Sequence, residues 1–288
     1  MHTVGSLRVL IRRQLEGYYE KRERESLSGL LLEEYLGQSG ASLCLDVNQP
    51  VTGEVFNLIE SAVSLLKKHV PVQYILGKAH FCGMVFRVSE HVLIPRQETE
   101  ELVGWICEDH PVSKTYSLPL RILDVGTGSG CIAVTLKKRM PGAQVTAVDI
   151  SREAVDVARS NAGQLGTDVM FVQLDMLDPN QWEALGRFDI IVSNPPYVLP
   201  SDRSRMNANV TDHEPALALF VSDHKPLMYY KAIAAYSGQH LGPQGMIYLE
   251  INERMGRQVC DLFENAGFEH TELRKDIHGR DRMVRVSR

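Results

Sequence analysis

Paired cysteines are missing from this sequence, which has five cysteines in 288 residues and no CxxC pair. An odd number of widely spaced thiols argues against a disulfide framework, a structural zinc site and a redox dithiol. The ten histidines show no HExxH or similar ligand spacing, so we predict no metal. The cysteines are typical of reduced thiols in a cytoplasmic protein.

Long apolar runs and an excess of positive charge are also missing. No stretch of about 18 uncharged apolar residues could span a bilayer, and the N-terminus has no apolar signal segment, so we expect neither membrane insertion nor secretion. The sequence has 31 Lys and Arg against 36 Asp and Glu. This balance lacks the broad basic field that binds nucleic acid, and we expect no direct nucleic-acid partner.

The first part of the chain has helical spacing between Ser6 and about Lys68. An apolar residue recurs on one face of the expected helix, at Leu7, Leu10, Ile11 and Leu15. Residues 1–75 carry eight Lys and Arg against nine Asp and Glu, so a basic groove is not the basis of binding here. We predict a small helical domain over residues 1–77.

A change of pattern follows this helical part. Residues 79–95 alternate apolar and polar side chains around Gly83, which predicts a β-hairpin. We therefore divide the chain into the helical domain at 1–77, a hairpin linker at 78–96 and a larger domain at 97–288. A chain with 44% apolar residues is long enough for one large core and a second, smaller unit.

The larger domain alternates strand-like and helical segments, the rhythm of a doubly wound, mostly parallel α/β sheet. The expected strands cover 120–125, 144–150, 168–175, 188–194, 245–251, 268–273 and 281–287, with helices at 131–140 and 151–162.

A glycine-rich loop joins the first of these strands to its helix. It reads Asp124-Val125-Gly126-Thr127-Gly128-Ser129-Gly130. Glycines permit a tight turn and close approach of a ligand, so we expect a nucleotide-like cofactor, although a turn that only packs helix on strand is the alternative. The dinucleotide fingerprint needs a glycine where Cys131 stands, which disfavours NAD. The loop resembles motif I of class I methyltransferases, which packs against the methionine part of S-adenosylmethionine.

Acidic residues end the next two strands. Asp149 can accept hydrogen bonds from both ribose hydroxyls of a nucleoside. Its alternative role is to cap the next helix, for which Ser151 is better placed. Asp175 could meet the adenine amine, and Met176 could cover the ring.

The tetrad Asn194-Pro195-Pro196-Tyr197 follows the fourth strand. Two consecutive prolines have fixed φ angles and no N–H groups, so their carbonyls are rigid acceptors. The Asn194 side-chain oxygen and the Pro195 carbonyl can each accept one hydrogen of an NH2 group, while Tyr197 stacks on a flat amide. An amide nitrogen is a poor nucleophile, so the main task is to hold it in line with the methyl group. An ordinary proline-rich turn is the alternative.

Seven segments resemble the HemK/PrmC family, whose members methylate the glutamine of the Gly-Gly-Gln loop in class I peptide chain release factors. They occur in the family's order and cover 71–77, 81–86, 93–100, 124–130, 194–197, 213–217 and 276–282. Three places depart from the family pattern: Gln97 replaces a proline, His213 replaces a tyrosine, and residues 224–226 interrupt an Asp-Gly segment.

The resemblance implies a class I methyltransferase sheet with an antiparallel last strand and assigns the site residues. The donor S-adenosylmethionine is bound by Asp124, Gly126, Thr127, Gly128, Ser129, Gly130, Asp149, Asp175, Met176 and Asn194. The acceptor glutamine is gripped by Asn194, Pro195, Pro196 and Tyr197, with Asn194, Pro195 and Tyr197 as the catalytic residues. Residues 1–77 help to dock the release factor, and we expect a cytoplasmic monomer.

Two further segments stay open in function. Residues 94–100 predict a turn into a helix, where Arg96 and Glu98 could line the cleft, although Glu98 could equally complement the helix N-terminus. Residues 198–225 form a segment longer than most structural connections, which we interpret as a lid or an acceptor-binding loop.

Three other functions compete with release-factor methylation. A DNA adenine-amino methyltransferase also acts on a planar NH2 group, but the charge balance argues against it. A glutamine methyltransferase of a ribosomal protein shares the chemistry. A binding module that keeps the fold without turnover is the third, and the intact Asp149 and tetrad argue against it.

Overall fold

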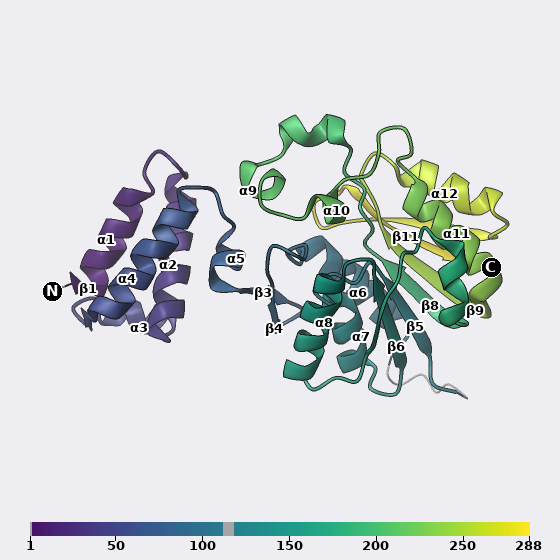
Figure 1. Cartoon of the computed structure of the whole chain (residues 1–288), viewed down its shortest axis with the longest axis horizontal. Helices are drawn as coiled ribbons and strands as arrows, with labels where there is room; N and C mark the ends of the chain where they lie inside the picture. Colours follow the sequence, from purple (N-terminus) through teal and green to yellow (C-terminus); the bar gives the residue numbers. More distant parts are fainter. Residues whose placement is uncertain (1, 112–117) are drawn as a thin grey trace. The chain divides into compact units, whose positions relative to one another are not determined.

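The structure, a computed structural model, describes residues 2–111 and 118–288 (Figure 1). The chain forms two compact units. The first comprises Met1–Gly77 together with Asn207–His213, and the second comprises Lys78–Met206 and Glu214–Arg288. In the described ranges, no helix has the length and apolar character needed to cross a bilayer.

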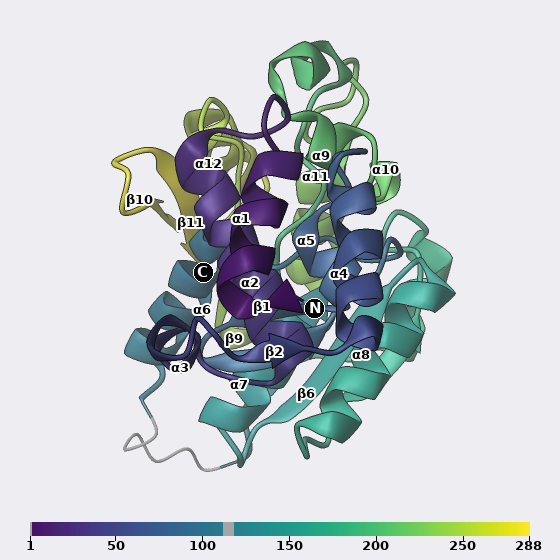
Figure 2. The same ribbon diagram turned by 90° about the vertical axis from the view of Figure 1, so that its left-hand side faces the viewer.

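The first unit is helical. Leu7, Ile11 and Leu15 are buried in its core, so the predicted face of the first helix is confirmed. Thr3 closes a capping box at the start of that helix, and Gly37 ends the second helix in the left-handed conformation. Figure 2 shows α1, α2 and α4 packed against one another. The helices are α1 (Val4–Gln14), α2 (Lys21–Leu36), α3 (Gly40–Leu45), α4 (Gly53–Leu66), α5 (Val72–Leu76) and α9 (Ala208–Thr211).

A pair of two-residue strands in this unit was not expected from the sequence. Strand β1 (His2–Thr3) pairs antiparallel with β2 (Pro50–Val51). Two residues are too few for a period-2 pattern to be visible. The second unit opens with the predicted hairpin, formed by β3 (Lys78–Phe81) and β4 (Met84–Arg87). The pairing ends at Arg87, so the strands are shorter than the alternation up to residue 95 suggested.

A seven-stranded sheet forms the second unit, in the order β10-β11-β9-β8-β5-β6-β7. Strand β11 runs antiparallel to both of its neighbours, and the pairs from β9 to β7 are parallel. The predicted mostly parallel sheet with an antiparallel last strand is therefore confirmed. The strands are β5 (Arg121–Val125), β6 (Gln144–Asp149), β7 (Met170–Gln173), β8 (Phe188–Ser193), β9 (Leu241–Glu250), β10 (His270–Lys275) and β11 (Asp281–Ser287).

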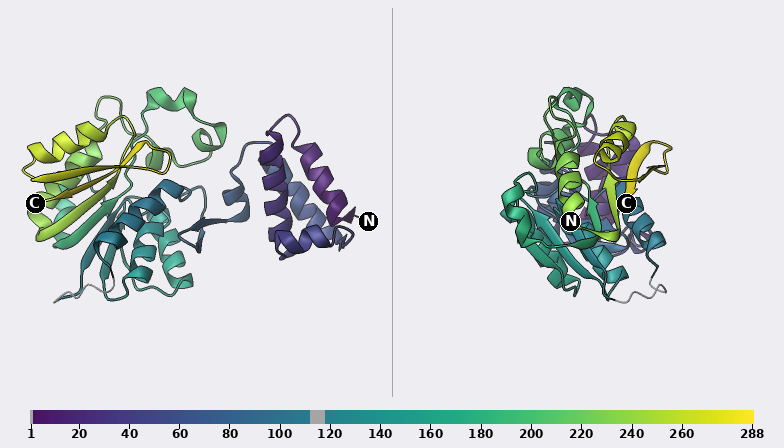
Figure 3. Two further views of the ribbon diagram at one scale, coloured as in Figure 1. Left: turned by 180° about the vertical axis from the view of Figure 1, so that it is seen from behind. Right: turned by 90° about the vertical axis from the view of Figure 1, so that its right-hand side faces the viewer.

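Helices cover both faces of this sheet (Figures 1 and 3). One apolar core joins the sheet to α6 (Gln97–Asp109), α7 (Cys131–Arg139) and α8 (Arg152–Gln164). The other joins it to α11 (Met228–His240), α12 (Gly256–Asn265) and the 3-10 helix η1 (Pro179–Ala184). The second unit is thus a layered α/β unit.

The strand order opens a crevice at one edge of the sheet. After β5 the chain adds β6 and β7 on one side of that strand, and later adds β8 and β9 on its other side. Val125 at the end of β5 is in register with both Val148 and Ser193. The glycine loop, Asp149 and the tetrad therefore leave the sheet at the same edge, where ligands bind in open α/β sheets.

Candidate active site

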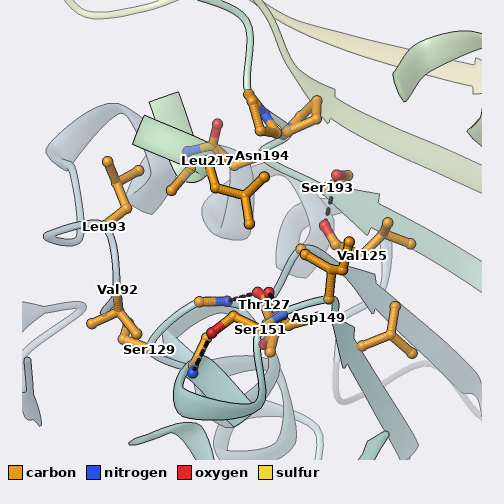
Figure 4. A pocket seen from close by; sticks show the side chains of 18 of the residues that line it. Val92, Leu93, Val125, Thr127, Ser129, Asp149, Ser151, Ser193, Asn194 and Leu217 are labelled. Carbon is orange, nitrogen blue, oxygen red and sulfur yellow. Dashed lines mark hydrogen bonds between the residues drawn. The ribbon is translucent and has the colours of Figure 1, made fainter. Parts of the chain in front are cut away.

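A cavity of about 370 Å³ lies at the carboxyl ends of β5, β6, β7 and β8. Figure 4 shows Thr127, Ser129, Asp149 and Ser151 on one side of it and Asn194 on the other. Its lining includes ten of the residues predicted for the site: Gly126, Thr127, Gly128, Ser129, Asp149, Asp175, Met176, Asn194, Pro195 and Pro196. Within the described chain, Asp124, Gly130 and Tyr197 are not part of this lining.

The glycines of the loop serve two purposes. Gly126 and Gly128 have φ angles of 74° and 54°, and a Cβ at either position would meet no described protein atom within 4 Å. Since both line the cavity, a side chain there would project into ligand space. A Cβ on Gly130 would instead lie 3.0 Å from the Ala158 Cβ, so this glycine lets α7 pack against α8. The ligand and packing interpretations therefore apply to different glycines.

Asp124 supports the loop from beneath. It is fully buried, and its Oδ2 accepts hydrogen bonds from the Thr127 hydroxyl at 2.7 Å and the Ala133 N–H at 3.2 Å. Among the described residues, its Oδ1 has no partner. Burial raises the pKa of this carboxyl to about 7 despite the two donors. Asp124 thus shapes the loop without lining the cavity.

Replacing Asp124 by Asn is expected to make stability less dependent on pH. The folded pKa of about 7 lies above the unfolded value of 3.8, so the stability from this group is present at low pH and lost as pH rises through 7. Between pH 5 and 8 the unfolding free energy of Asp124→Asn should rise relative to that of the wild type by roughly 3 kcal/mol. Urea unfolding without ligand measures this. The matched control is Asp156→Asn at an exposed position, whose unfolding free energy should keep the same difference from wild type at both pH values. An equal change with pH in this control would contradict the assignment.

Asp149 braces the glycine loop and faces the cavity. Its Oδ2 accepts from the Gly128 N–H at 2.8 Å, and its Oδ1 accepts from the Ser151 N–H at 3.0 Å. Ser151, not Asp149, caps α8, because its hydroxyl accepts from the Ala154 N–H at 3.1 Å. Burial raises the pKa of Asp149, and backbone donors oppose that rise. Each carboxylate oxygen keeps a lone pair that can accept from a diol.

The remaining cavity wall suits an aromatic ring. Met176 is buried, and the Asp175 Oδ1 accepts from the Leu177 N–H at 2.8 Å. Ile150 and Leu217 line the cavity although 44% and 54% of their surfaces are exposed. Exposed apolar side chains beside a cavity lose that exposure when a ligand covers them, which favours binding. The glycine cradle, the diol acceptor and this wall together fit the adenosyl part of a nucleoside donor.

Several lining residues were missed in the sequence. They include Val92 and Leu93 after the hairpin, Ile150, Leu217 and Tyr229. Apolar residues in a sequence read equally well as core, so nothing marked them. Burial raises the pKa of Tyr229, and the nearby charges of Asp175 and Asp149 raise it further. Its position on α11 gave no local signal of such proximity.

The tetrad is held from behind by hydrogen bonds. The Asn194 Nδ2 donates to the Thr99 hydroxyl at 3.0 Å, and the Tyr197 hydroxyl donates to the Glu250 Oε1 at 2.9 Å. The Asn252 Nδ2 donates to the Tyr197 carbonyl at 3.3 Å. Burial raises the pKa of Tyr197 well above its ordinary value. The stacking of Tyr197 on an acceptor amide stays a prediction.

Arg96 meets Glu214, a residue of the segment 198–225, beside the cavity. Arg96 lines it and pairs with the buried Glu214 at 2.5 Å, while Glu214 also accepts from the Ile94 N–H at 3.2 Å. Glu98 instead lies in the first turn of α6, outside the lining among the described residues. Hydrogen bonds of 2.9 Å between Val198 and residues 219 and 221 close the base of the segment. It contains η2 (Pro200–Arg205), α9 and the lining helix α10 (Ala216–Leu219).

Family models match both parts of the chain. The model described as "Methyltransferase small domain" matches residues 113–212, and "PrmC N-terminal domain" matches residues 7–77. A "Release factor glutamine methyltransferase" of Flavobacterium psychrophilum is 40% identical over 275 residues, covering 95% of each chain. One of the same name from Bacteroides thetaiotaomicron is 40% identical over 278 residues, covering 96% of this chain and 98% of the relative.

Solved structures show the same fold at low identity. The "Human methyltransferase 10 domain containing protein" is 16% identical, with a TM-score of 0.51, and the match covers 81% of this chain and 97% of that one. At this identity the likeness concerns the fold alone.

Proposed function

The chain belongs to the family of release factor glutamine methyltransferases, and on that premise we propose that it methylates a glutamine side-chain amide in class I peptide chain release factors. The proposed methyl donor is S-adenosylmethionine. The proposed acceptor is the nitrogen of the glutamine in the Gly-Gly-Gln loop.

The observation that carries this proposal is the orientation of Asn194 at the cavity wall. Its Nδ2 donates to Thr99, and its Oδ1 has no hydrogen-bond partner among the described residues. An oxygen can accept an N–H of the acceptor amide, whereas a nitrogen donor could not. Pro195 and Pro196 line the same cavity, and neither has an N–H that would compete for the acceptor.

The chemistry asks the protein mainly for positioning. S-adenosylmethionine supplies, when bound, a methyl group already activated on a sulfonium sulfur. The Asn194 Oδ1 and the Pro195 carbonyl accept the two N–H hydrogens and aim the amide nitrogen at that methyl group. A carbon–nitrogen bond forms, the carbon–sulfur bond breaks, and S-adenosylhomocysteine leaves. The nitrogen becomes acidic as the new bond forms, so its proton can leave without a strong base.

The donor end of the site is assigned to the opposite wall. Gly126 and Gly128 leave room for the methionine part, and Asp149 accepts the ribose hydroxyls. Asp175 and Met176 meet the adenine.

The proposal extends to the partner and its surroundings. The first unit, with residues 1–77, would dock the release factor, and residues 198–225 would close over or bind its glutamine loop. A release factor acts in translation, which places the proposed enzyme in the cytoplasm. We propose that it works as a monomer, without a metal and without binding nucleic acid directly.

Methyl-labelled S-adenosylmethionine tests the proposed function. The purified full chain is offered release factors, ribosomal proteins and DNA separately, and mass spectrometry locates the label. Label on the glutamine of the Gly-Gly-Gln loop is the expected result, and a release factor with that glutamine changed to alanine should take none. Label on a ribosomal-protein glutamine or on DNA adenine would contradict the proposed acceptor. No label with any acceptor would favour the alternative of a binding module without turnover.

A further inference from the structure

Behind Asn194, two buried side chains extend its hydrogen bond into the protein, and we name Glu250, Thr99 and Asn194 the orienting chain. The Thr99 hydroxyl donates to the Glu250 Oε2 at 2.6 Å and accepts from the Asn194 Nδ2 at 3.0 Å. Thr99 and Glu250 are only 2% and 1% exposed. Thr99 lines the cavity, whereas Glu250 is not among its described lining residues.

The fold brings these three residues together from distant segments. Thr99 lies in the first turn of α6, and Glu250 ends β9. Leu249 is in register with Ser193, so Glu250 and Asn194, which follow them, lie side by side where the pairing of β8 and β9 ends. The contact thus follows from the parallel pairing of β8 and β9.

The two ends of an asparagine amide have opposite roles in hydrogen bonding. The oxygen accepts and the nitrogen donates, and rotating the group by half a turn exchanges them. An acceptor NH2 needs the oxygen, because a reversed amide would set N–H against N–H. A hydroxyl partner alone cannot choose between the two, since it both donates and accepts. Thr99 without Glu250 would leave the orientation of Asn194 undecided.

Glu250 removes this ambiguity. An ionised carboxylate only accepts, so the single hydroxyl proton of Thr99 must point to Glu250. Only lone pairs of the hydroxyl then face Asn194, and they can accept its N–H but cannot donate to its oxygen. Burial raises the pKa of Glu250, and the hydroxyl donors and the charge of Arg282 oppose that rise. The Tyr197 hydroxyl donates to the other carboxylate oxygen at 2.9 Å, so both oxygens of Glu250 accept from a hydroxyl, as an ionised carboxylate does. The Thr99 hydroxyl, the Tyr197 hydroxyl and the Asn194 NH2 group all find acceptors only when the Asn194 nitrogen faces Thr99.

We infer that Thr99 and Glu250 are positioning residues, which lock the Asn194 amide with its oxygen toward the acceptor nitrogen. The inference rests on the proposed function, because it requires an acceptor that presents an NH2 group. It adds two residues whose effect on methyl transfer passes through Asn194.

Variants of Thr99 test the accepting hydroxyl. Thr99→Val keeps the shape of the side chain but removes the hydroxyl. Single-turnover methyl transfer should then slow roughly 10- to 100-fold. The KM for the release factor and the affinity for S-adenosylhomocysteine should stay within about threefold, because the other release-factor contacts and the donor wall are unchanged. Thr99→Ser restores the hydroxyl and should recover transfer to within about threefold of wild type. Wild-type transfer by Thr99→Val, or an equal loss in Thr99→Ser, would overturn the inference.

Glu250→Gln tests the direction of the hydrogen bonds. The new NH2 group can donate to Thr99, which frees the threonine proton to point at Asn194 and favours the reversed amide. Transfer should therefore slow by a factor similar to that of Thr99→Val. The matched control is Tyr230→Phe, which removes the buried hydroxyl that donates to the Glu250 carbonyl at 3.1 Å. That variant loses a hydrogen bond at the same residue outside the orienting chain and should transfer within about threefold of wild type. An equal slowing in Tyr230→Phe would assign the effect to general destabilisation.

A direct readout separates this inference from the proposed function. In protein with ¹⁵N-labelled asparagine, the side-chain NH2 resonances of Asn194 are assigned by their loss in Asn194→Ala. They should move in Thr99→Val and Glu250→Gln and stay in place in Tyr230→Phe. If the wild type methylates no glutamine, the proposed function fails and these resonances alone decide the orienting chain. Unmoved resonances in Thr99→Val would overturn it even where methyl transfer is seen.

Discussion

Replacing Asn194 by alanine is expected to slow methyl transfer to the release factor by roughly 100- to 1000-fold. The variant loses the side-chain oxygen that aims the acceptor nitrogen, and the remaining Pro195 carbonyl holds only one of the two hydrogens. The affinity for S-adenosylhomocysteine should change by less than about threefold, because the donor keeps the glycine loop and Asp149. Single-turnover mass spectrometry and calorimetry measure the two quantities.

A second variant separates the position of the amide from its presence. Asn194→Gln keeps the same group on a side chain one methylene longer, and a displacement of roughly 1 Å is enough to spoil alignment. We expect its transfer rate to fall nearly as far as that of Asn194→Ala. Turnover near the wild-type rate in the alanine variant would refute the role assigned to Asn194.

Replacing Asp149 by alanine should weaken donor binding on the order of 100-fold. The variant loses a carboxylate that can accept both ribose hydroxyls, and hydrogen bonds to a charged acceptor are stronger than neutral ones. The rate at saturating donor should fall much less, since the acceptor wall is untouched. Calorimetric titration with S-adenosylhomocysteine gives the affinity, and initial rates at saturating donor give the turnover.

The structural duties of Asp149 call for a control. Its oxygens also accept from the Gly128 and Ser151 N–H groups, so its loss should lower the unfolding temperature without ligand. Asp156→Ala removes the same charge from the exposed side of α8 and should leave donor affinity within about threefold. A folded Asp149→Ala protein with unchanged donor affinity would refute the ribose assignment.

Much of this site can be predicted from the sequence because the motifs that mark it are short and continuous. A glycine loop and a proline-rich tetrad each occupy fewer than ten consecutive residues, and each follows a strand that its own apolar pattern predicts. The alternation of strands and helices also predicts that the glycine loop and the tetrad meet at one edge of the sheet. The family assignment from these segments is confirmed by relatives 40% identical over nearly the whole chain.

The rest of the site depends on contacts between residues that are far apart in the sequence, which local patterns do not predict. Thr99 precedes Asn194 by 95 residues, and only the packing of α6 against the sheet makes them neighbours. Asp124 shows the opposite difficulty. An acidic residue before a glycine loop can face the ligand or hold the loop, and its full burial with Thr127 became visible only in three dimensions.

The membership of Asn207–His213 in the first unit limits how the two units can be recombined. The chain leaves the second unit after Met206 and returns at Glu214, the partner of Arg96 in the cavity wall. Within the first unit, His213 lies 2.9 Å from the Lys68 carbonyl. A chimaera that takes residues 1–77 from a relative must therefore take 207–213 from the same relative, and these two stretches should vary together in evolution.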